Sequence, residues 1–216
     1  ARRVFKTVTP RVYASPSWHE GRLYHFFSDG TLVCLSADTG REVWTRRVVK
    51  EFESAEPTRR TPLVRNGVVY TIDENNSILA LDAATGEVKG IYNIIKAGDF
   101  TITGGNTLIA AGAERVIALN MSSGAIIWKK DLSHGPMQSV FAAGDLLFVL
   151  SNRRAPLLGV YFLSTASGYI EALRIEDGST AWEKKLSSSI SANGASAQTF
   201  VTLLPDDGEL VLFKSP

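Results

Sequence analysis

The sequence predicts an all-β fold, a five-bladed β-propeller built from four-stranded antiparallel blades. Three observations lead to this prediction. A phrase of strand, turn and glycine recurs along the chain, a tryptophan follows most of these glycines, and the two chain ends look like parts of one further copy. The chain has 216 residues, which gives each of five blades about 43 residues, within the range of known blade repeats.

The recurring phrase is an apolar strand followed by a short turn that ends in glycine. The glycines that close its copies are Gly40, Gly86, Gly124 and Gly178. A tryptophan stands four residues after three of them, as Trp44, Trp128 and Trp182. In the second copy, Gly90 takes the place of the tryptophan. Such self-similarity at a period of a few tens of residues is typical of repeat folds.

Upstream of each phrase, a second glycine opens another strand, and an apolar residue precedes this glycine by three positions. These pairs are Trp18 and Gly21, Val64 and Gly67, Ile102 and Gly105, and Phe141 and Gly144. Asx and glycine residues tolerate the positive φ of tight hairpin turns. We therefore expect two-residue turns between the second and third strands, at Asp29-Gly30, Asn75-Asn76, Ala113-Glu114 and Ser167-Gly168. The innermost strands are expected near Arg11–Ser15, Arg59–Val64, Gly98–Thr103, Met137–Ala142 and Ser189–Asn193.

The two ends of the chain together supply a fifth copy. Residues 200–213 provide a second strand, a turn and a third strand, but no outer strand. Residues 1–8 align with residues 40–47, and Phe5 falls at the tryptophan position. We expect this N-terminal strand to complete the last blade and to close a single domain over residues 1–216, because closure removes open sheet edges. A piece of a larger ring, or a ring shared by two chains, stays open as an alternative.

The phrase Ala80–Gly86, together with the tryptophans of the other copies, resembles the tryptophan-docking motif of the pyrroloquinoline-quinone-like (PQQ-like) repeat family. The resemblance covers essentially the whole chain. It implies that Phe5, Trp44, Trp128 and Trp182 are structural docking residues whose rings lie between neighbouring blades. The sequence departs from the motif at Ser36, Asn120 and Arg174, which replace its aspartate.

The same resemblance bears on activity and location. Quinone-dependent enzymes of the family have larger rings and hold quinone and calcium with carboxylates, an asparagine and adjacent cysteines. The single cysteine of this chain, Cys34, does not provide that set. Non-catalytic relatives, such as outer-membrane assembly lipoproteins that bind proteins, are the closer analogues. The resemblance therefore implies a scaffold in the periplasm or at the cell surface rather than in the cytoplasm.

A search for catalytic and ligand-binding sets gives no candidate. Asp99 is the only acid in the expected innermost strands, whereas glycoside hydrolysis needs two carboxylates. His19, His25 and His134 lack the spacing of a zinc site, so neither a metal nor a cofactor is predicted. The net charge of +1 gives no reason to expect a nucleic-acid partner. No apolar run is long enough for a transmembrane helix.

Two enlarged loops are the predicted surface for a protein partner. The first carries Arg46, Arg47, Arg59 and Arg60, and the second carries Arg153, Arg154 and Leu157. Loops on a rigid scaffold concentrate binding residues, and arginine is enriched in protein interfaces. The predicted function is a monomeric, non-catalytic protein-interaction scaffold, not an enzyme. The alternatives are a lectin-like propeller that binds glycans or small molecules through Tyr24 and Tyr70, and a degenerate quinone-dependent dehydrogenase or hydrolase.

Overall fold

The computed structural model describes residues 15–27, 29–49, 61–153, 167–190, 195–197, 200–203, 205 and 211–214. By its contacts the chain divides into two compact units, Ala1–Asn93 and Ile94–Pro216. All secondary-structure elements assigned within the described ranges are β-strands. These ranges contain no helix of the length and hydrophobicity that crossing a membrane requires.

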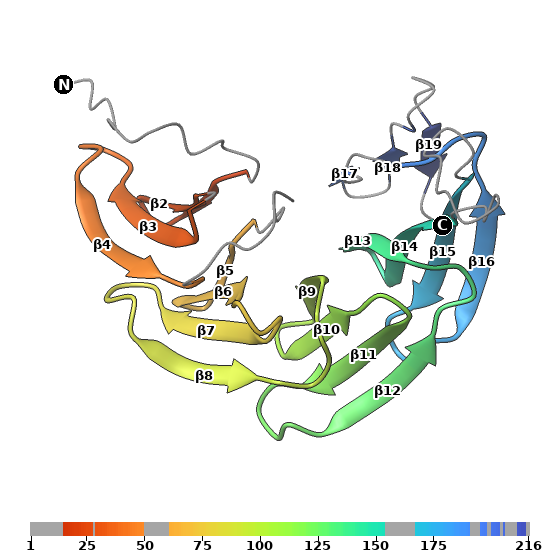
Figure 1. The fold of residues 1–216 in the computed structure, drawn as a ribbon, viewed down its shortest axis with the longest axis horizontal. Helices are drawn as coiled ribbons and strands as arrows, with labels where there is room; N and C mark the ends of the chain where they lie inside the picture. Colours follow the sequence, from red (N-terminus) through yellow and green to blue (C-terminus); the bar gives the residue numbers. More distant parts are fainter. Residues whose placement is uncertain are drawn as a thin grey trace. The chain divides into compact units, whose positions relative to one another are not determined.

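The first unit contains two four-stranded antiparallel meanders, in which each strand pairs with the next along the chain (Figure 1). The strands of the first blade are β1 (Ser17–His19), β2 (Arg22–Phe26), β3 (Thr31–Ser36) and β4 (Glu42–Arg47). Those of the second blade are β5 (Leu63–Arg65), β6 (Val68–Ile72), β7 (Ile78–Asp82) and β8 (Val88–Tyr92).

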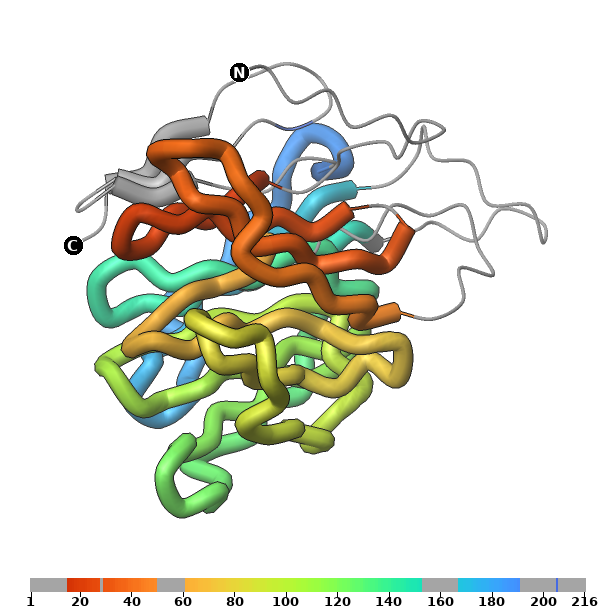
Figure 2. The backbone as a smooth tube through the Cα atoms, turned by 90° about the vertical axis from the view of Figure 1, so that its left-hand side faces the viewer, coloured from red at the N-terminus to blue at the C-terminus, as the bar shows by residue number. Residues whose placement is uncertain are grey.

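The second unit repeats this arrangement in two further blades. Figure 2 draws the backbone as a tube, in which the strands of the first unit run from red to yellow. The third blade consists of β9 (Asp99–Thr103), β10 (Thr107–Ala111), β11 (Arg115–Asn120) and β12 (Ile126–Asp131). The fourth consists of β13 (Met137–Ala143), β14 (Leu146–Arg153), β15 (Ser167–Arg174) and β16 (Thr180–Lys185). A three-stranded sheet follows, made of β17 (Ala195–Ala197), β18 (Phe200–Leu203) and β19 (Val211–Lys214).

The all-β prediction and the four-stranded antiparallel blades are confirmed. The structure describes four complete blades rather than the five predicted, and the second unit also contains the three-stranded sheet. The N-terminal strand that was expected to complete a fifth blade, and with it Phe5, lies outside the described residues. A closed ring over the single domain 1–216 therefore stays a prediction.

The innermost strands begin later than predicted in the first two blades, where the structure places β1 at Ser17–His19 and β5 at Leu63–Arg65. The reason is the tight turn on the glycine after each of these strands, which aligns the preceding apolar residue with the second strand, as in the pairs Trp18 with Leu23 and Val64 with Val69. The strand predicted at Ser189–Asn193 falls largely outside the described residues. The predictions for β9 and β13 differ from the structure by a single residue at one end.

Left-handed backbone conformations allow the tight turns before the second strands. Asn66 and Gly67 have φ angles of 50° and 70°, and Gly104 and Gly105 have 55° and 88°. Positive φ at two successive positions is typical of a type I′ turn. One predicted turn was wrong: Ser167 and Gly168 belong to β15 and pair with Arg153 and Asn152. Both strands have eight residues, and the segment that joins them, residues 154–166, lies outside the described residues.

A β-bulge at the same place in every complete blade was not predicted. The register shifts between Cys34 and Leu35, Ala80 and Leu81, Ala118 and Leu119, and Ala172 and Leu173. In the first and third blades the extra residues are Val43 and Ile127, which are exposed. A bulge bends its strand and re-aims the side chains beside it. The residue that follows is the tryptophan, which stands opposite a small side chain, Cys34 or Ala118.

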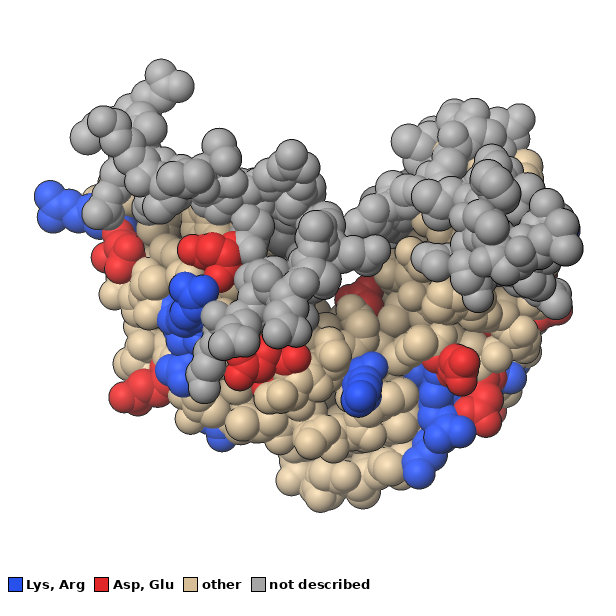
Figure 3. All heavy atoms as spheres, viewed as in Figure 1, with Lys and Arg blue, Asp and Glu red and all other residues tan. Residues whose placement is uncertain are grey.

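The middle strands form the cores, whereas the outer strands are mostly exposed. In β7 the first four residues are buried, but in β4 and β12 only the tryptophan is buried. Cations and anions are interspersed over the face drawn in Figure 3, with broad uncharged areas between them. This surface shows no large area of a single charge, in keeping with the net charge of +1.

Candidate functional site

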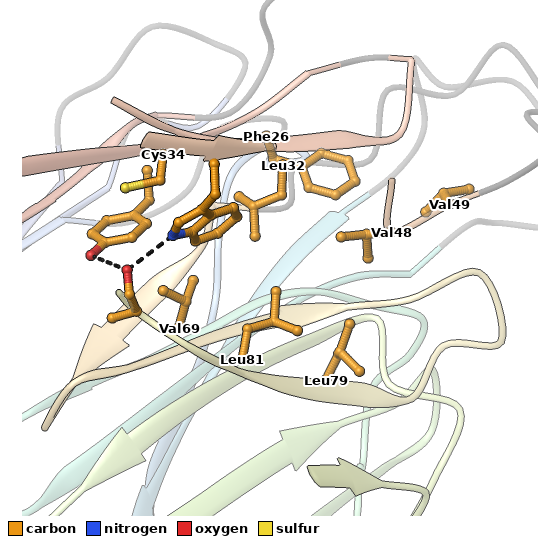
Figure 4. Packing of buried hydrophobic residues seen from close by; sticks show 11 residues of the cluster. Phe26, Leu32, Cys34, Val48, Val49, Val69, Leu79 and Leu81 are labelled. Carbon is orange, nitrogen blue, oxygen red and sulfur yellow. Dashed lines mark hydrogen bonds between the residues drawn. The ribbon is translucent and has the colours of Figure 1, made fainter. Parts of the chain in front are cut away.

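The turn after the third strand of the second blade receives the indole of Trp44. The indole N–H donates to the Ala83 carbonyl over 3.0 Å, and the Tyr24 hydroxyl donates to the same oxygen over 3.1 Å. Both bonds are drawn as dashed lines in Figure 4, above Val69, Leu79 and Leu81 of the second blade. The ring covers Gly86, where a Cβ would lie 2.8 Å from Trp44 Cδ2. An aromatic body with one polar group is suited to this position, because its N–H keeps a partner when buried.

The fourth blade repeats this geometry with Trp128. Its indole N–H donates to the Ile175 carbonyl over 2.8 Å, and a Cβ on Gly178 would lie 2.6 Å from Trp128 Cε3. We call Ala83–Gly86 and Ile175–Gly178 the docking turns. Trp182 contacts Phe148 edge-on, with ring centroids 5.8 Å apart. That these aromatic residues hold the blades together stays a prediction, which is tested below.

Side-chain oxygens hold the turns in shape. In the second blade Asp82 Oδ1 accepts the N–H groups of Ala84 and Thr85. In the third blade Asn120 Oδ1 accepts those of Ser122 and Ser123. The backbone N–H bonds lower the pKa of the Asp82 carboxyl, because they favour its ionised form. Asparagine thus substitutes for the aspartate that the repeat motif favours, since an amide oxygen accepts the same bonds.

The predicted interaction residues are only partly described. Arg46 and Arg47 end β4, and Arg46 Nη1 donates to the Gly86 carbonyl over 3.1 Å. Arg46 therefore contacts the docking turn Ala83–Gly86, which lies in the same compact unit. Arg153 ends β14, but its side chain lies outside the described residues, as do Arg154, Leu157, Arg59 and Arg60. The predicted interaction role of these residues stays a prediction.

The two tyrosines considered for glycan binding are buried. Tyr24 is 1% exposed and Tyr70 is 7% exposed. The Tyr24 hydroxyl donates to Ala83, and burial raises its pKa, as it also does for Tyr70. Neither ring therefore offers a surface to a sugar in this structure.

Asp99 links the innermost strands of the third and fourth blades. Its carboxylate accepts the backbone N–H of Phe100 over 2.8 Å and that of Val140, in β13, over 2.9 Å. Burial raises the pKa of Asp99 to about 6, and the two backbone bonds oppose this shift. Among the described residues of the innermost strands, Asp99 is the only acid. Through these two hydrogen bonds, Asp99 connects β9 to β13.

This carboxyl group makes a testable contribution to pH-dependent stability. The folded state binds the Asp99 proton more tightly than the unfolded chain does, because the pKa rises from 3.8 to about 6. The stabilisation is complete below pH 4 and is lost as the pH rises through about 6. We expect the urea midpoint of Asp99→Asn to fall less over this range than that of the native chain. Asp38→Asn, at an exposed carboxyl in a turn of the first blade, is the control and should keep the native slope; an unchanged slope in Asp99→Asn would refute the assignment.

A buried polar cluster in the fourth blade was missed by the sequence analysis. Glu171 is fully buried, and its Oε1 accepts the backbone N–H groups of Ser133 and His134. The imidazole of His134 stacks on Tyr169 at 3.8 Å, and its Nε2 lies 3.5 Å from Glu183 Oε2. These contacts hold the connector between β12 and β13 against β15 and β16. A signal was available, because the equivalent positions in the other blades are Val33, Leu79 and Ile117, all apolar.

Among the described residues, the remaining candidates, Cys34 and His25, are not part of a catalytic or metal-binding arrangement. Cys34 is buried and free, and burial raises its thiol pKa. His25 contacts Phe27 edge-on, and burial lowers its pKa. Within the described ranges, no three His, Cys, Asp or Glu side chains converge on a common point where a metal could bind.

A family model described as "Outer membrane protein assembly factor BamB" matches residues 5–89 and 94–215. The chain belongs to this family. The match confirms the PQQ-like repeat predicted from the tryptophan-docking motif, and it extends over both compact units.

Individual relatives of the BamB family are distant from the chain. Outer membrane protein assembly factor BamB of Escherichia coli K12 is 26% identical over 168 residues, which cover 74% of this chain and 39% of that protein. An uncharacterized protein of Rickettsia conorii is 29% identical over 137 residues, 56% of this chain and 32% of that protein. The chain thus spans about two fifths of the BamB proteins it matches.

Solved structures share the β-propeller fold. BamB from Moraxella catarrhalis superposes with a TM-score of 0.54 at 14% identity, covering 94% of this chain and 71% of that one. Hydrazine synthase from Kuenenia stuttgartiensis gives a TM-score of 0.66 at 10% identity, covering 94% and 58%. At such identities the likeness concerns the fold alone, because one fold serves many functions.

Proposed function

We propose that this chain is a non-catalytic scaffold that binds protein partners during the assembly of outer membrane proteins. The observation that carries the proposal is the BamB family match over residues 5–89 and 94–215. The blades supply a rigid frame, and the predicted partner surface is the pair of arginine-bearing loops. A place outside the cytoplasm, in the periplasm or at the cell surface, belongs to the same proposal.

The architecture gives this proposal a physical basis. Outer strands such as β4 and β12 keep most side chains exposed, while the buried tryptophans occupy docking turns. Connectors between blades are thereby held at fixed positions, as Glu171 holds Ser133 and His134. Loops on such a frame can present binding groups with little loss of conformational entropy on association.

Reversal of two charges in the fourth-blade loop tests the proposal. We expect Arg153→Glu combined with Arg154→Glu to reduce capture of outer membrane assembly proteins from a solubilised cell envelope by about tenfold or more, because an arginine at an interface hot spot contributes about 2 kcal/mol or more. Quantitative mass spectrometry of the captured proteins is the measurement.

The matched control is Lys184→Glu combined with Lys185→Glu, which makes the same charge change at two exposed positions of β16. Its capture should stay within about twofold of the native chain, because exposed surface charges contribute little. Equal losses in both double variants would remove the specific role of the loop. Failure of the native chain to capture any such protein would contradict the scaffold itself.

A further inference from the structure

Two glutamates of the fourth blade face the connector that joins β12 to β13. Glu171 of β15 and Glu183 of β16 are direct cross-strand partners. Glu171 is fully buried, whereas the side chain of Glu183 is 54% exposed. Two ionised carboxylates directly opposite one another on antiparallel strands destabilise the sheet. Hydrogen-bond donors or a positive charge at this place therefore stabilise the fourth blade.

The connector supplies the donors, and one of its residues can also supply the charge. The backbone N–H groups of Ser133 and His134 donate to Glu171 Oε1 over 3.1 Å and 3.2 Å. The imidazole of His134 stacks on Tyr169, and its Nε2 lies 3.5 Å from Glu183 Oε2. His134 thus contacts both strands, β15 through its backbone and ring and β16 through its ring alone.

Two buried polar atoms of this cluster leave a place for a further proton. Among the described residues, none forms a hydrogen bond with Nδ1 of His134 or with Oε2 of Glu171. A neutral imidazole has one N–H donor, whereas a protonated imidazole has two donors and a positive charge. Hydrogen bonds between charged groups are about twice as strong as those between neutral groups. Protonation of His134 therefore strengthens its contact with Glu183 and offsets the repulsion between the two carboxylates.

Other charged or titratable groups lie on the elements around His134. They are Tyr169 and Lys185, which pair across β15 and β16, Glu114, Arg115 and Asp131 on the neighbouring part of the third blade, and Asp99, which binds β13. Among these, Asp99 also changes charge in the weakly acidic range, because burial raises its pKa to about 6. A test of His134 therefore has to separate it from Asp99.

The residues on either side of His134 form one wall of a groove. The groove has a volume of about 890 Å³, and this wall consists of Leu132, Gly135 and Pro136. The hairpin between β10 and β11 forms another wall, and Leu132 N–H donates to the Glu114 carbonyl of that hairpin over 2.9 Å. All lining residues belong to the second compact unit. The way in which His134 is held thus bears directly on the shape of this groove.

We propose that His134 is a pH-sensitive switch, which in its protonated form holds the connector (residues 132–136) against β15 and β16. In its neutral form, the connector opens more readily and the groove changes shape. Histidine is the side chain that ordinarily changes charge between pH 5 and 8. The stabilisation is present at the acidic end of this range and is lost as the pH rises. This switch goes beyond the proposed scaffold function and does not depend on it.

Hydrogen exchange of the ¹⁵N-labelled full chain, followed by NMR, tests the switch. We expect the protection factors of the Ser133 and His134 amides to fall by about fivefold between pH 5 and pH 8, the effect of one partly exposed charged contact on the opening equilibrium. The Gly178 amide donates to the Arg174 carbonyl over 2.9 Å in the same blade and is the internal control. Its protection factor should stay constant. Equal protection factors of Ser133 and His134 at both pH values would overturn the proposal.

Four variants assign the effect to His134. In His134→Gln, which is neutral at every pH, the protection factors of the connector should not change between pH 5 and pH 8. Glu183→Gln removes the facing charge at a half-exposed position and should reduce the fall to less than about twofold. His19→Gln is the matched control, because His19 Nε2 lies 3.8 Å from Glu20 Oε1 in the first unit, and it should keep the fivefold fall. Asp99→Asn should keep it as well.

The outcomes of these variants distinguish the switch from other titrations. A fall that persists in His134→Gln, or one that disappears in Asp99→Asn, would overturn the assignment to His134. If His134→Gln unfolds, Glu183→Gln still decides the outcome, since it replaces no buried side chain. The amide shifts of Leu132 and Gly135 report on the groove and should change between pH 5 and pH 8 in the native chain. Shifts that stay constant over this range would overturn the proposed effect on the groove.

Discussion

Trp128→Ala is expected to lower the free energy of unfolding by about 3–5 kcal/mol, the usual loss when a large buried aromatic side chain is removed. Trp128 is 7% exposed, donates to the Ile175 carbonyl over 2.8 Å and packs in the core shared by the third and fourth blades. Its removal takes away the cover of Gly178 and the hydrogen-bond donor of the half-buried Ile175 carbonyl. Urea unfolding followed by circular dichroism measures the loss.

Trp18→Ala is the control for this substitution. Trp18 is 68% exposed, and we expect its replacement to change stability by less than about 0.5 kcal/mol. If both variants lost similar stability, the indole of Trp128 would have no special part in holding the third and fourth blades together, and the docking prediction would be wrong.

Gly178→Ala is expected to cost about 2–5 kcal/mol. The residue has a φ of +72°, where an L side chain is strained by about 1–2 kcal/mol. A Cβ there would also lie 2.6 Å from Trp128 Cε3, and such overpacking costs about 1–3 kcal/mol. The free energy of unfolding in urea is again the measurement.

A double-mutant cycle isolates the contact between the new methyl group and the indole. In a Trp128→Ala background, Gly178→Ala should cost only the backbone strain, about 1–2 kcal/mol. Gly67→Ala, at a positive φ with open surroundings, should cost the same in the native background. If Gly178→Ala cost no more than Gly67→Ala, the close approach of Trp128 would be refuted.

Much of the fold could be predicted from the sequence because its signals are local. Alternating apolar residues, turn glycines and the tryptophan spacing define the second, third and fourth strands of each blade without reference to distant contacts. The three-residue strands β1 and β5 were placed too early, since strands this short have too few residues for a recognisable pattern. Their positions are set by pairing across the turn, as Trp18 pairs with Leu23.

The bulge before each tryptophan could not be predicted, because a single inserted residue has no distinctive sequence pattern. Val43 and Ile127 look like ordinary apolar strand residues, yet the bulge leaves them exposed and allows Trp44 and Trp128 to be buried.

For the candidate interaction site, the sequence predicted only the kind of surface, which is a pair of arginine-bearing loops. Loop length and arginine content identified Arg153, Arg154 and their neighbours, whereas Glu171 required comparison of equivalent positions between blades. Its environment depends on the connector that crosses to it, with Ser133 and His134 donating to its carboxylate. Which residue such a connector contacts is decided by the tertiary structure, and the local spacing of residues in the sequence does not reveal it.

Hydrogen exchange of the indole N–H groups, followed by NMR on the native chain, tests the docking of the tryptophans most directly. The N–H groups of Trp44 and Trp128 donate to Ala83 and Ile175 and should exchange slowly, whereas that of the exposed Trp18 should exchange at nearly the rate of a free indole. Exchange of Trp44 and Trp128 as fast as that of Trp18 would contradict the account.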